Sequence, residues 1–258
     1  MCSASPELPP EFCSRPLAHR GLHDRGRGVI ENSRAAVRAA VAAGYGIEID
    51  VQRAACGEVM VFHDAELRRL TGRRGLVAER SAAELGAIPL TGGGETIPTL
   101  VEILAIVAGR APLLIEFKDP DPMLGPTTGA LEARAAELLA GYVGPVALMS
   151  FNPHSVAAAA RAAPDRPRGL TTCNFEGPKW PLSETRRGEL AGICDFGPTG
   201  SAFISHNHRE LDSPAVSALK ARGVPVLCWT VRGPAEEAAA RRVADNITFE
   251  GYAPDRPG

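Results

Sequence analysis

Short apolar runs alternate with Ala-rich amphipathic segments along most of the chain. The apolar runs have the length and composition of strands, and the amphipathic segments have the spacing of helices with one buried face. We therefore predict eight strands, over 16–20, 46–51, 113–118, 146–151, 168–172, 193–196, 224–231 and 246–249. The predicted helices between them cover 33–43, 98–108, 129–141, 153–162, 183–190, 213–222 and 234–242.

This alternation is typical of βα units joined into a parallel sheet. Eight strands with seven intervening helices favour an α/β fold of the (β/α)8 TIM-barrel type. Counting elements leaves an open, doubly wound sheet as the alternative. No repeat of fixed period and no linker divides the chain, so we predict one barrel domain over 16–258.

One segment interrupts the alternation after the second strand. Cys56-Gly57 fits a tight turn, and the apolar run 59–62 follows it. We predict a β-hairpin that leaves the barrel and returns His63 toward the end of the second strand. Residues 52–97 are expected to form a small insertion with a short helix near 81–86. Residues 1–15 are expected to form an N-terminal extension, and the sequence leaves open whether that extension is ordered.

Composition narrows the range of partners. The 258 residues include 28 Lys or Arg and 30 Asp or Glu, a formal net charge of −2, which argues against nucleic acid as the main partner. The most apolar stretch, 100–114, is interrupted by charged residues, Gly and Pro, so no transmembrane segment is expected. The N-terminus lacks the apolar run of a secretory signal, and the six cysteines form no CxxC pair. We therefore expect a cytoplasmic protein, of an oligomeric state that the sequence does not indicate.

Charged residues stand near the ends of three predicted strands, where a TIM barrel carries its active site. Glu48 and Asp50 are two positions apart on one strand, so their side chains share a face. Glu116 and Lys118 have the same relation on the next strand. Two carboxylates ~4 Å apart repel by about 4 kcal/mol at an effective dielectric constant near 20. A hard divalent ion, Mg²⁺ or Ca²⁺ in preference to Zn²⁺, would relieve this repulsion. A salt-bridge network without metal fits the spacing equally well.

Two histidines are predicted at the same barrel mouth. His19 precedes Arg20, and His63 precedes Asp64. Two imidazoles beside a reaction centre could act as general base and general acid. The simpler alternative is that each is a half-buried structural histidine. His206 and His208 form an HxH pattern that could bind metal, but their polar neighbours favour a solvated loop.

Six short motifs, taken in order, resemble the glycerophosphodiester phosphodiesterase family. They are HRG at 19–21, ENS at 31–33, EIDV at 48–51, VFHD at 61–64, EFK at 116–118 and WTV at 229–231. The resemblance covers the chain from about residue 16 to residue 254 and implies a (β/α)8 barrel with a small insertion. It also implies an enzyme that cleaves small-molecule glycerophosphodiesters to sn-glycerol 3-phosphate and an alcohol.

The resemblance implies a role for each matching residue. The expected ligands of a divalent cation, Mg²⁺ or Ca²⁺, are Glu48, Asp50 and Glu116. The expected general acid and base are His19 and His63. The remaining expected site residues are Arg20 and Lys118 at the substrate phosphate, Glu31 and Asn32 as supports, and Trp229 at the substrate pocket, joined by Phe151.

Two departures from the family pattern stand out. Cys56-Gly57 replaces the common Asp-Gly at the hairpin turn, which keeps the glycine that the turn needs. Thr248-Phe249-Glu250 replaces a common Thr-Asp ending of the last strand, which leaves the headgroup preference open. The sequence also leaves open which histidine is the acid, and whether a cyclic phosphate forms or water attacks directly.

Two other functions remain as alternatives. One is a phosphodiesterase of the same fold with another substrate, such as a lysophospholipase D, which a longer apolar groove beside the mouth would favour. The other is a non-catalytic module that binds a phosphorylated ligand through the metal site.

Overall fold

A closed parallel barrel forms the centre of the molecule in the computed structural model, which describes residues 6–255. The strands are β1 (Leu17–Ala18), β2 (Gly46–Arg53), β3 (Val59–Val61), β4 (Leu113–Phe117), β5 (Val146–Ser150), β6 (Arg168–Thr172), β7 (Phe203–Asn207), β8 (Val226–Val231) and β9 (Asn246–Phe249). The hydrogen-bonded order is β1-β9-β8-β7-β6-β5-β4-β2, and β1 also pairs with β2. That last pairing closes the ring, so the predicted (β/α)8 barrel is confirmed and an open sheet is excluded.

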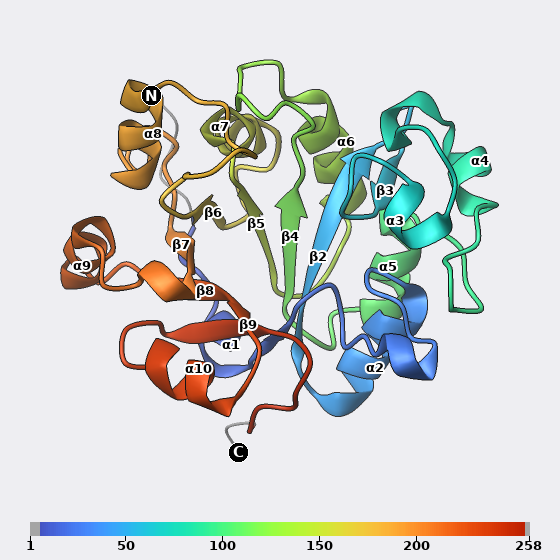
Figure 1. Cartoon of the computed structure of the whole chain (residues 1–258), viewed down its shortest axis with the longest axis horizontal. Helices are drawn as coiled ribbons and strands as arrows, with labels where there is room; N and C mark the ends of the chain where they lie inside the picture. Colours follow the sequence, from blue (N-terminus) through green and yellow to red (C-terminus); the bar gives the residue numbers. More distant parts are fainter. Residues whose placement is uncertain (1–5, 256–258) are drawn as a thin grey trace.

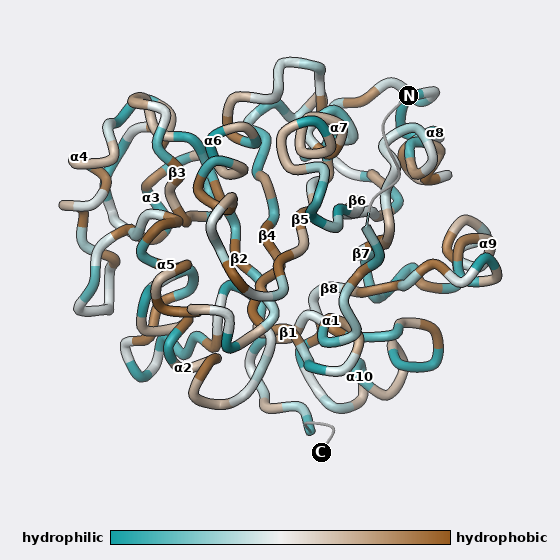
Figure 2. Tube along the Cα trace, turned by 180° about the vertical axis from the view of Figure 1, so that it is seen from behind, coloured by the Kyte–Doolittle hydropathy of each residue, from teal (hydrophilic) through white to brown (hydrophobic). Residues whose placement is uncertain are grey.

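Helices surround the barrel and connect its strands (Figure 1). They are α1 (Glu11–Ser14), α2 (Arg34–Ala43), α3 (Arg68–Thr71), α4 (Ala82–Gly86), α5 (Leu100–Val107), α6 (Ala130–Leu139), α7 (Pro153–Ala162), α8 (Glu184–Ala191), α9 (Pro214–Ala221) and α10 (Pro234–Ala240), with short 3-10 turns at Arg25–Arg27, Val77–Glu79 and His208–Glu210. Helix α2 illustrates the local rules, because Ser33 caps its N-terminus and Gly44, with φ of 76°, ends it. Apolar segments gather along the strands in the middle of the molecule (Figure 2).

Strand register decides which side chains face the barrel interior. Across β2 and β4, Glu48 pairs with Leu114 and Asp50 with Glu116. The same inward row continues through Met149 on β5 and, from β7 to β8, through Asn207 paired with Trp229. Because alternate residues of a strand point to opposite faces, the last inward positions of several strands meet at one mouth.

The opposite end of the barrel is filled by apolar side chains. Leu8 and Phe12 join Leu114, Phe203 and Leu227 in one buried cluster, and Phe12 is fully buried. The amide of Asn246 donates to the carbonyl oxygens of Phe12 and Arg15, which fixes α1 beneath β9. Part of the expected N-terminal extension is therefore an ordered barrel floor, while residues 1–5 lie outside the described residues.

The insertion after β2 has a small core of its own. Strands β2 and β3 form the predicted antiparallel hairpin, and Gly57 adopts φ of 90° at its turn. A second buried cluster contains Met60 and Phe62 from the hairpin side, Leu67 directly before α3, Leu85 from α4, and Ile30 from the loop before α2. The insertion is thus packed against the loop that carries the ENS motif.

The predicted strand at 193–196 is wrong. Residues 192–200 form turns directly after α8, and Ile193 has a φ of 53°, which no strand residue adopts. The seventh barrel strand is β7, which pairs with β6 and β8. Its polar residues Ser205, His206 and Asn207 made it resemble a loop, but Ser205 and His206 are buried inside the sheet.

Candidate active site

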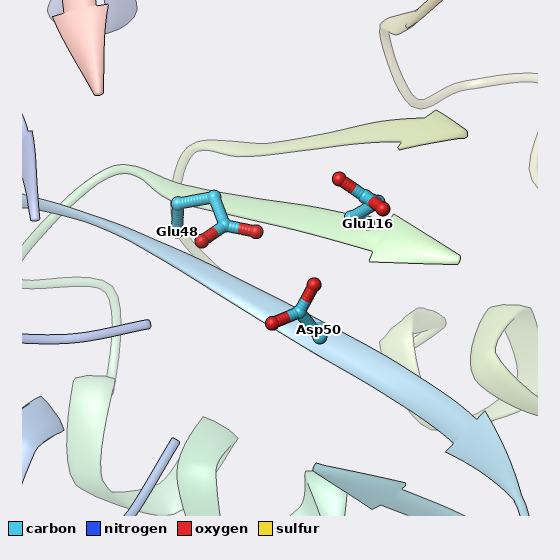
Figure 3. Close-up of side chains that lie close together, drawn as sticks. All are labelled: Glu48, Asp50 and Glu116. Atoms are coloured by element: carbon cyan, nitrogen blue, oxygen red, sulfur yellow. The ribbon is translucent and has the colours of Figure 1, made fainter. Parts of the chain in front are cut away.

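Three carboxylates meet at the mouth of the barrel. Glu48 and Asp50 project from β2 and Glu116 from β4, and their side chains converge on one point (Figure 3). One ligand oxygen from each lies within 4.8 Å of the others, and all three residues are buried. The predicted convergence of these carboxylates is therefore what the structure shows.

Two cations and one amide face these carboxylates. Lys118 Nζ lies 2.7 Å from Glu116 Oε1 and 3.5 Å from Asp50 Oδ1. Arg20 Nε lies 3.3 Å from Asp50 Oδ2, and the Arg20 backbone N–H donates to Glu48 at 2.9 Å. The side-chain amide of Asn32 donates to Asp50 at 2.9 Å. With all three carboxyls ionised, as metal binding requires, the cluster and the two cations together carry one net negative charge.

Burial and neighbouring charges shift the pKa values of the two β2 carboxyls in opposite directions. Burial, with the nearby charges of Asp50 and Glu116, raises the pKa of Glu48 well above its ordinary range. Burial also acts to raise the pKa of Asp50, but Lys118 and the other positive groups around it hold that pKa below its ordinary range. The donor set consists of carboxylate oxygens alone, which fits a hard divalent cation better than a thiophilic one. Such an ion would change the net charge of the ionised cluster from −1 to +1.

Two residues of the ENS motif contact members of this cluster. Glu31 accepts from Arg20, and Asn32 accepts from the Asp50 backbone at 3.2 Å as well as donating to its side chain. Ser33 caps α2. These contacts place Glu31 and Asn32 against Arg20 and Asp50, and the supporting role of the two residues stays a prediction.

The backbone around Arg20 is held in an uncommon conformation. Arg20 and Asn32 have φ values of 57° and 55°, in the left-handed region that residues other than glycine rarely adopt. Gly21, with φ of 77°, passes so close to α2 that an added Cβ would lie 2.8 Å from the backbone of Ala36. A glycine is required there because α2 and the HRG turn touch.

Each of the two histidines is paired with a carboxylate. His19 Nδ1 lies 2.6 Å from Glu250 Oε2, and His63 Nδ1 lies 2.7 Å from Asp64 Oδ1. His19 and His63 both line the cavity that contains the acidic cluster. The sequence did not identify Glu250 as the partner of His19. Its position two residues after the inward-facing Thr248 was the available signal.

Arg69 of α3 links the carboxylate beside His63 with the carboxylate beside Arg20. Its guanidinium contacts Glu31 at 2.7 and 2.8 Å and Asp64 at 2.5 and 2.9 Å. Contacts therefore run without a break from His63 through Asp64, Arg69 and Glu31 to Arg20. Arg69 had no sequence signal of its own, because its role depends on where the insertion places α3.

An aromatic wall completes the cavity, whose volume is about 420 Å³. The ring centroid of Phe151 lies 5.4 Å from that of Trp229 and 5.3 Å from that of Trp180. Trp229 Nε1 donates to the carbonyl oxygen of Ser205, and Lys118 Nζ lies 5.9 Å from the Phe151 centroid. The structure thus brings Trp229 and Phe151 together as expected and adds Trp180.

His206 lies outside this site and is not the solvated loop residue expected from the sequence. It is 2% exposed, and its Nδ1 lies 2.7 Å from Thr172 Oγ1. Burial lowers its pKa to about 4, so the ring stays neutral at physiological pH. His208 follows in a 3-10 turn and approaches Glu236 at 3.9 Å. No metal-binding group in the described residues includes either histidine.

Comparison with known proteins adds to this geometry. Residues 19–257 match the glycerophosphoryl diester phosphodiesterase family. The chain belongs to this family. The match begins at His19 and spans every motif on which the resemblance rested, so the expected membership is confirmed. Glycerophosphoryl diester phosphodiesterases depend in general on divalent metal ions, and the buried acidic cluster of this chain could bind one.

One relative supports the same conclusion, and two solved structures share the fold. A glycerophosphodiester phosphodiesterase of Caldanaerobacter subterraneus is 30% identical over 226 residues, which cover 83% of this chain and 84% of the relative. An Oleispira antarctica phosphodiesterase, solved with the product sn-glycerol-3-phosphate, aligns with a TM-score of 0.73 at 23% identity, covering 95% of this chain and 93% of that one. A Parabacteroides distasonis glycerophosphodiester phosphodiesterase gives a TM-score of 0.71 at 22% identity, covering 91% and 92%. Among residues 6–255, no helix is both long and apolar enough to cross a membrane.

Proposed function

We propose that the protein hydrolyses glycerophosphodiesters to sn-glycerol 3-phosphate and an alcohol, with Mg²⁺ or Ca²⁺ held by Glu48, Asp50 and Glu116. The observation that carries the proposal is one cavity that contains a buried carboxylate cluster, two histidines and two cations. Family membership and the product in the Oleispira structure support the choice of substrate.

Charge balance suits a phosphodiester. The cluster with Arg20 and Lys118 carries one net negative charge, and a divalent ion would make it one positive charge. A phosphodiester carries one negative charge, so the loaded site and the substrate neutralise each other. When bound, the ion would supply Lewis-acid stabilisation of the charge on the phosphate. Arg20 and Lys118 orient the diester, and the planar guanidinium of Arg20 suits two phosphate oxygens at once.

Proton transfer falls to the two histidines in this proposal. His19 follows β1 and His63 follows the hairpin, and both line the cavity. We place the substrate phosphate between them, with one imidazole near each ester oxygen. One histidine removes the proton of the attacking oxygen, and the other donates a proton to the departing alcohol. The attacking oxygen is either that of water, which gives glycerol 3-phosphate directly, or the glycerol 2-hydroxyl, which gives a cyclic phosphate that a water molecule then opens. The glycerol carbons lie against the rings of Trp229 and Phe151, which exclude water from that side.

The deciding experiment is release of glycerol 3-phosphate from glycerophosphocholine by the purified protein. We expect turnover with Mg²⁺ or Ca²⁺ and none in excess EDTA. The Glu116→Gln variant should lose at least ~100-fold in activity and should also lose the rise in melting temperature on adding metal. A His19→Ala, His63→Ala double variant that keeps full activity would contradict the proposed proton transfer. Tight binding of several diesters without turnover would instead favour a non-catalytic binding module.

A second substrate class is favoured by a groove next to the mouth. This groove, of about 350 Å³, shares Lys118, Asp119 and Pro120 with the catalytic cavity. Its walls include Leu76, Ala78 and Leu131, and Leu76 is a large apolar side chain that is 38% exposed. A hydrocarbon chain attached to the substrate could lie there, so lysophospholipids are our second candidate.

Lysophosphatidylcholine and glycerophosphocholine should therefore be compared in parallel. If the groove holds an acyl chain, Leu76→Asp lowers activity on the lysolipid about tenfold and leaves glycerophosphocholine unaffected. Val101→Asp is the matched control, because Val101 is 50% exposed and does not line the groove. Lysolipid turnover that Leu76→Asp leaves unchanged would exclude the groove as the acyl site.

A further inference from the structure

The carboxylate beside His19 comes from a position at which this chain departs from the common family ending. Glu250 follows β9 and continues its inward-facing row. Its backbone N–H donates to Val231 of β8, and the His19 backbone N–H donates to Phe249 of β9. The backbones of both partners are therefore fixed by the barrel, so the 2.6 Å contact between His19 Nδ1 and Glu250 Oε2 does not depend on a mobile loop.

Arg232 braces the other oxygen of the same carboxylate. Arg232 Nε donates to Glu250 Oε1 at 2.8 Å, and His23 Nε2 lies 3.6 Å from Oε2. The two oxygens of Glu250 thus have different partners: Oε1 accepts from a permanent cation, and Oε2 faces the His19 ring.

The charge state of Glu250 determines which nitrogen of His19 carries the proton. Burial alone would raise the pKa of Glu250, but its contacts with His19, His23 and Arg232 hold that pKa below the ordinary range. An ionised carboxylate accepts and cannot donate, so His19 Nδ1 donates to it. Burial lowers the pKa of His19 itself, with Arg20 acting in the same direction, while Glu250 and Asp50 oppose it. The neutral ring then has a free lone pair on Nε2.

We propose that Glu250, braced by Arg232, is a positioning residue that holds His19 in the Nδ1–H tautomer with Nε2 free for proton transfer in the cavity. The catalytic part of this inference rests on the proposed function, because it requires His19 to move a proton. The tautomer part does not require turnover.

The decisive variant is Glu250→Gln, which has nearly the same shape as the native side chain. Arg232 would hold the amide oxygen, so the amide NH₂ would face His19 and donate to Nδ1. The His19 proton would then move to Nε2, the nitrogen that must be free. We expect kcat for glycerophosphocholine to fall about 100- to 1,000-fold, with KM changed less than about twofold.

A double-mutant cycle separates positioning from a general effect on the fold. In a His19→Ala background, Glu250→Gln should cause less than about a threefold further loss, because residues that act as one unit are not additive. Glu236→Gln is the control, since Glu236 accepts from the Arg232 backbone but has no contact with His19. A full additional loss in the His19→Ala background would overturn the proposal.

The tautomer can also be observed without any substrate. In ¹⁵N NMR of the histidine rings, His19, assigned with His19→Ala, should carry its proton on Nδ1 in the unmodified protein and on Nε2 in Glu250→Gln. Nε2–H in the unmodified protein would refute the proposal. If no diester is hydrolysed but the NMR result holds, the proposed function fails and the placement of the His19 proton stands.

Discussion

At the scale of single residues, Trp229 connects the aromatic wall to the barrel. Its Nε1 atom donates to the Ser205 carbonyl on the neighbouring strand, and its ring packs edge-on against Phe151. The wall presents carbon faces and no charge, so we expect it to bind an apolar edge of the substrate about equally well in the ground state and the transition state.

Replacing Trp229 with Ala should therefore raise KM for glycerophosphocholine more than it lowers kcat. We expect KM to rise about tenfold and kcat to fall less than about threefold, the result of losing uniform binding. Trp229→Phe is the matched control, because it keeps a ring and loses only the hydrogen bond to Ser205. Steady-state kinetics would contradict this role if Trp229→Ala lowered kcat alone.

Residue-level prediction from the sequence succeeded where alternation on a strand was visible. The i, i+2 spacing of Glu48 and Asp50 was enough to predict a shared face, and the structure brings Glu116 to the same point. Glu250 was overlooked because it stands beyond the last strand, in a segment noted only as a departure. Arg69 was overlooked because no short-range pattern relates it to Glu31, 38 positions away.

At the scale of elements, the four-residue helix α3 places a charged side chain at the barrel mouth. It is held by Leu67 and Leu70 in the core of the insertion, and it directs Arg69 toward the mouth. The insertion is thus the element that connects the carboxylate partner of His63 with the carboxylate partner of Arg20.

Arg69→Met should disturb both connections while leaving the fold intact. We expect kcat to fall about tenfold through misplacement of His63 and Arg20. The free energy of unfolding should change by about 1 kcal/mol, since the Arg69 side chain is 43% exposed and solvent screens its ion pairs. Arg68→Met, an exposed neighbour on α3, is the control, and equal kinetic losses in the two variants would argue against a specific role for Arg69.

Element prediction failed at β7 for a physical reason. A strand in a closed barrel is covered by helices outside and by other side chains inside, so polar residues can be buried there when they find partners. Thr172 provides such a partner for His206, on the neighbouring strand β6. A reading based on apolar runs favours 193–196 over 203–207, because only register with neighbouring strands reveals the partner.

At the scale of the whole molecule, the charge network makes the free energy of unfolding depend on pH. Partner cations hold the pKa of Glu31 and Asp64 below the ordinary range against the effect of burial, and the same holds for Glu250. A carboxyl whose pKa is lower in the folded state stabilises the fold above its unfolded pKa of about 4, and this contribution is lost as pH falls toward the folded value.

We therefore expect the free energy of unfolding to be nearly constant from pH 7 to 5 and to fall by roughly 2 to 4 kcal/mol between pH 5 and 2. Urea unfolding at a series of pH values measures this directly. The fall should be smaller in Arg69→Met, which lacks the partner of both Glu31 and Asp64. A stability that rises as pH drops below 4 would show that these ion pairs do not determine the acid response.

The closed floor of the barrel limits where substrate can enter the cavity and where products can leave it. Phe12 and its neighbours close the far end of the barrel, so the catalytic cavity opens to solvent on the side of the aromatic wall and the rim residues. The incoming diester, the departing alcohol and glycerol 3-phosphate are all expected to pass through this opening. Glycerol 3-phosphate that accumulates is therefore expected to compete with fresh substrate for the cavity.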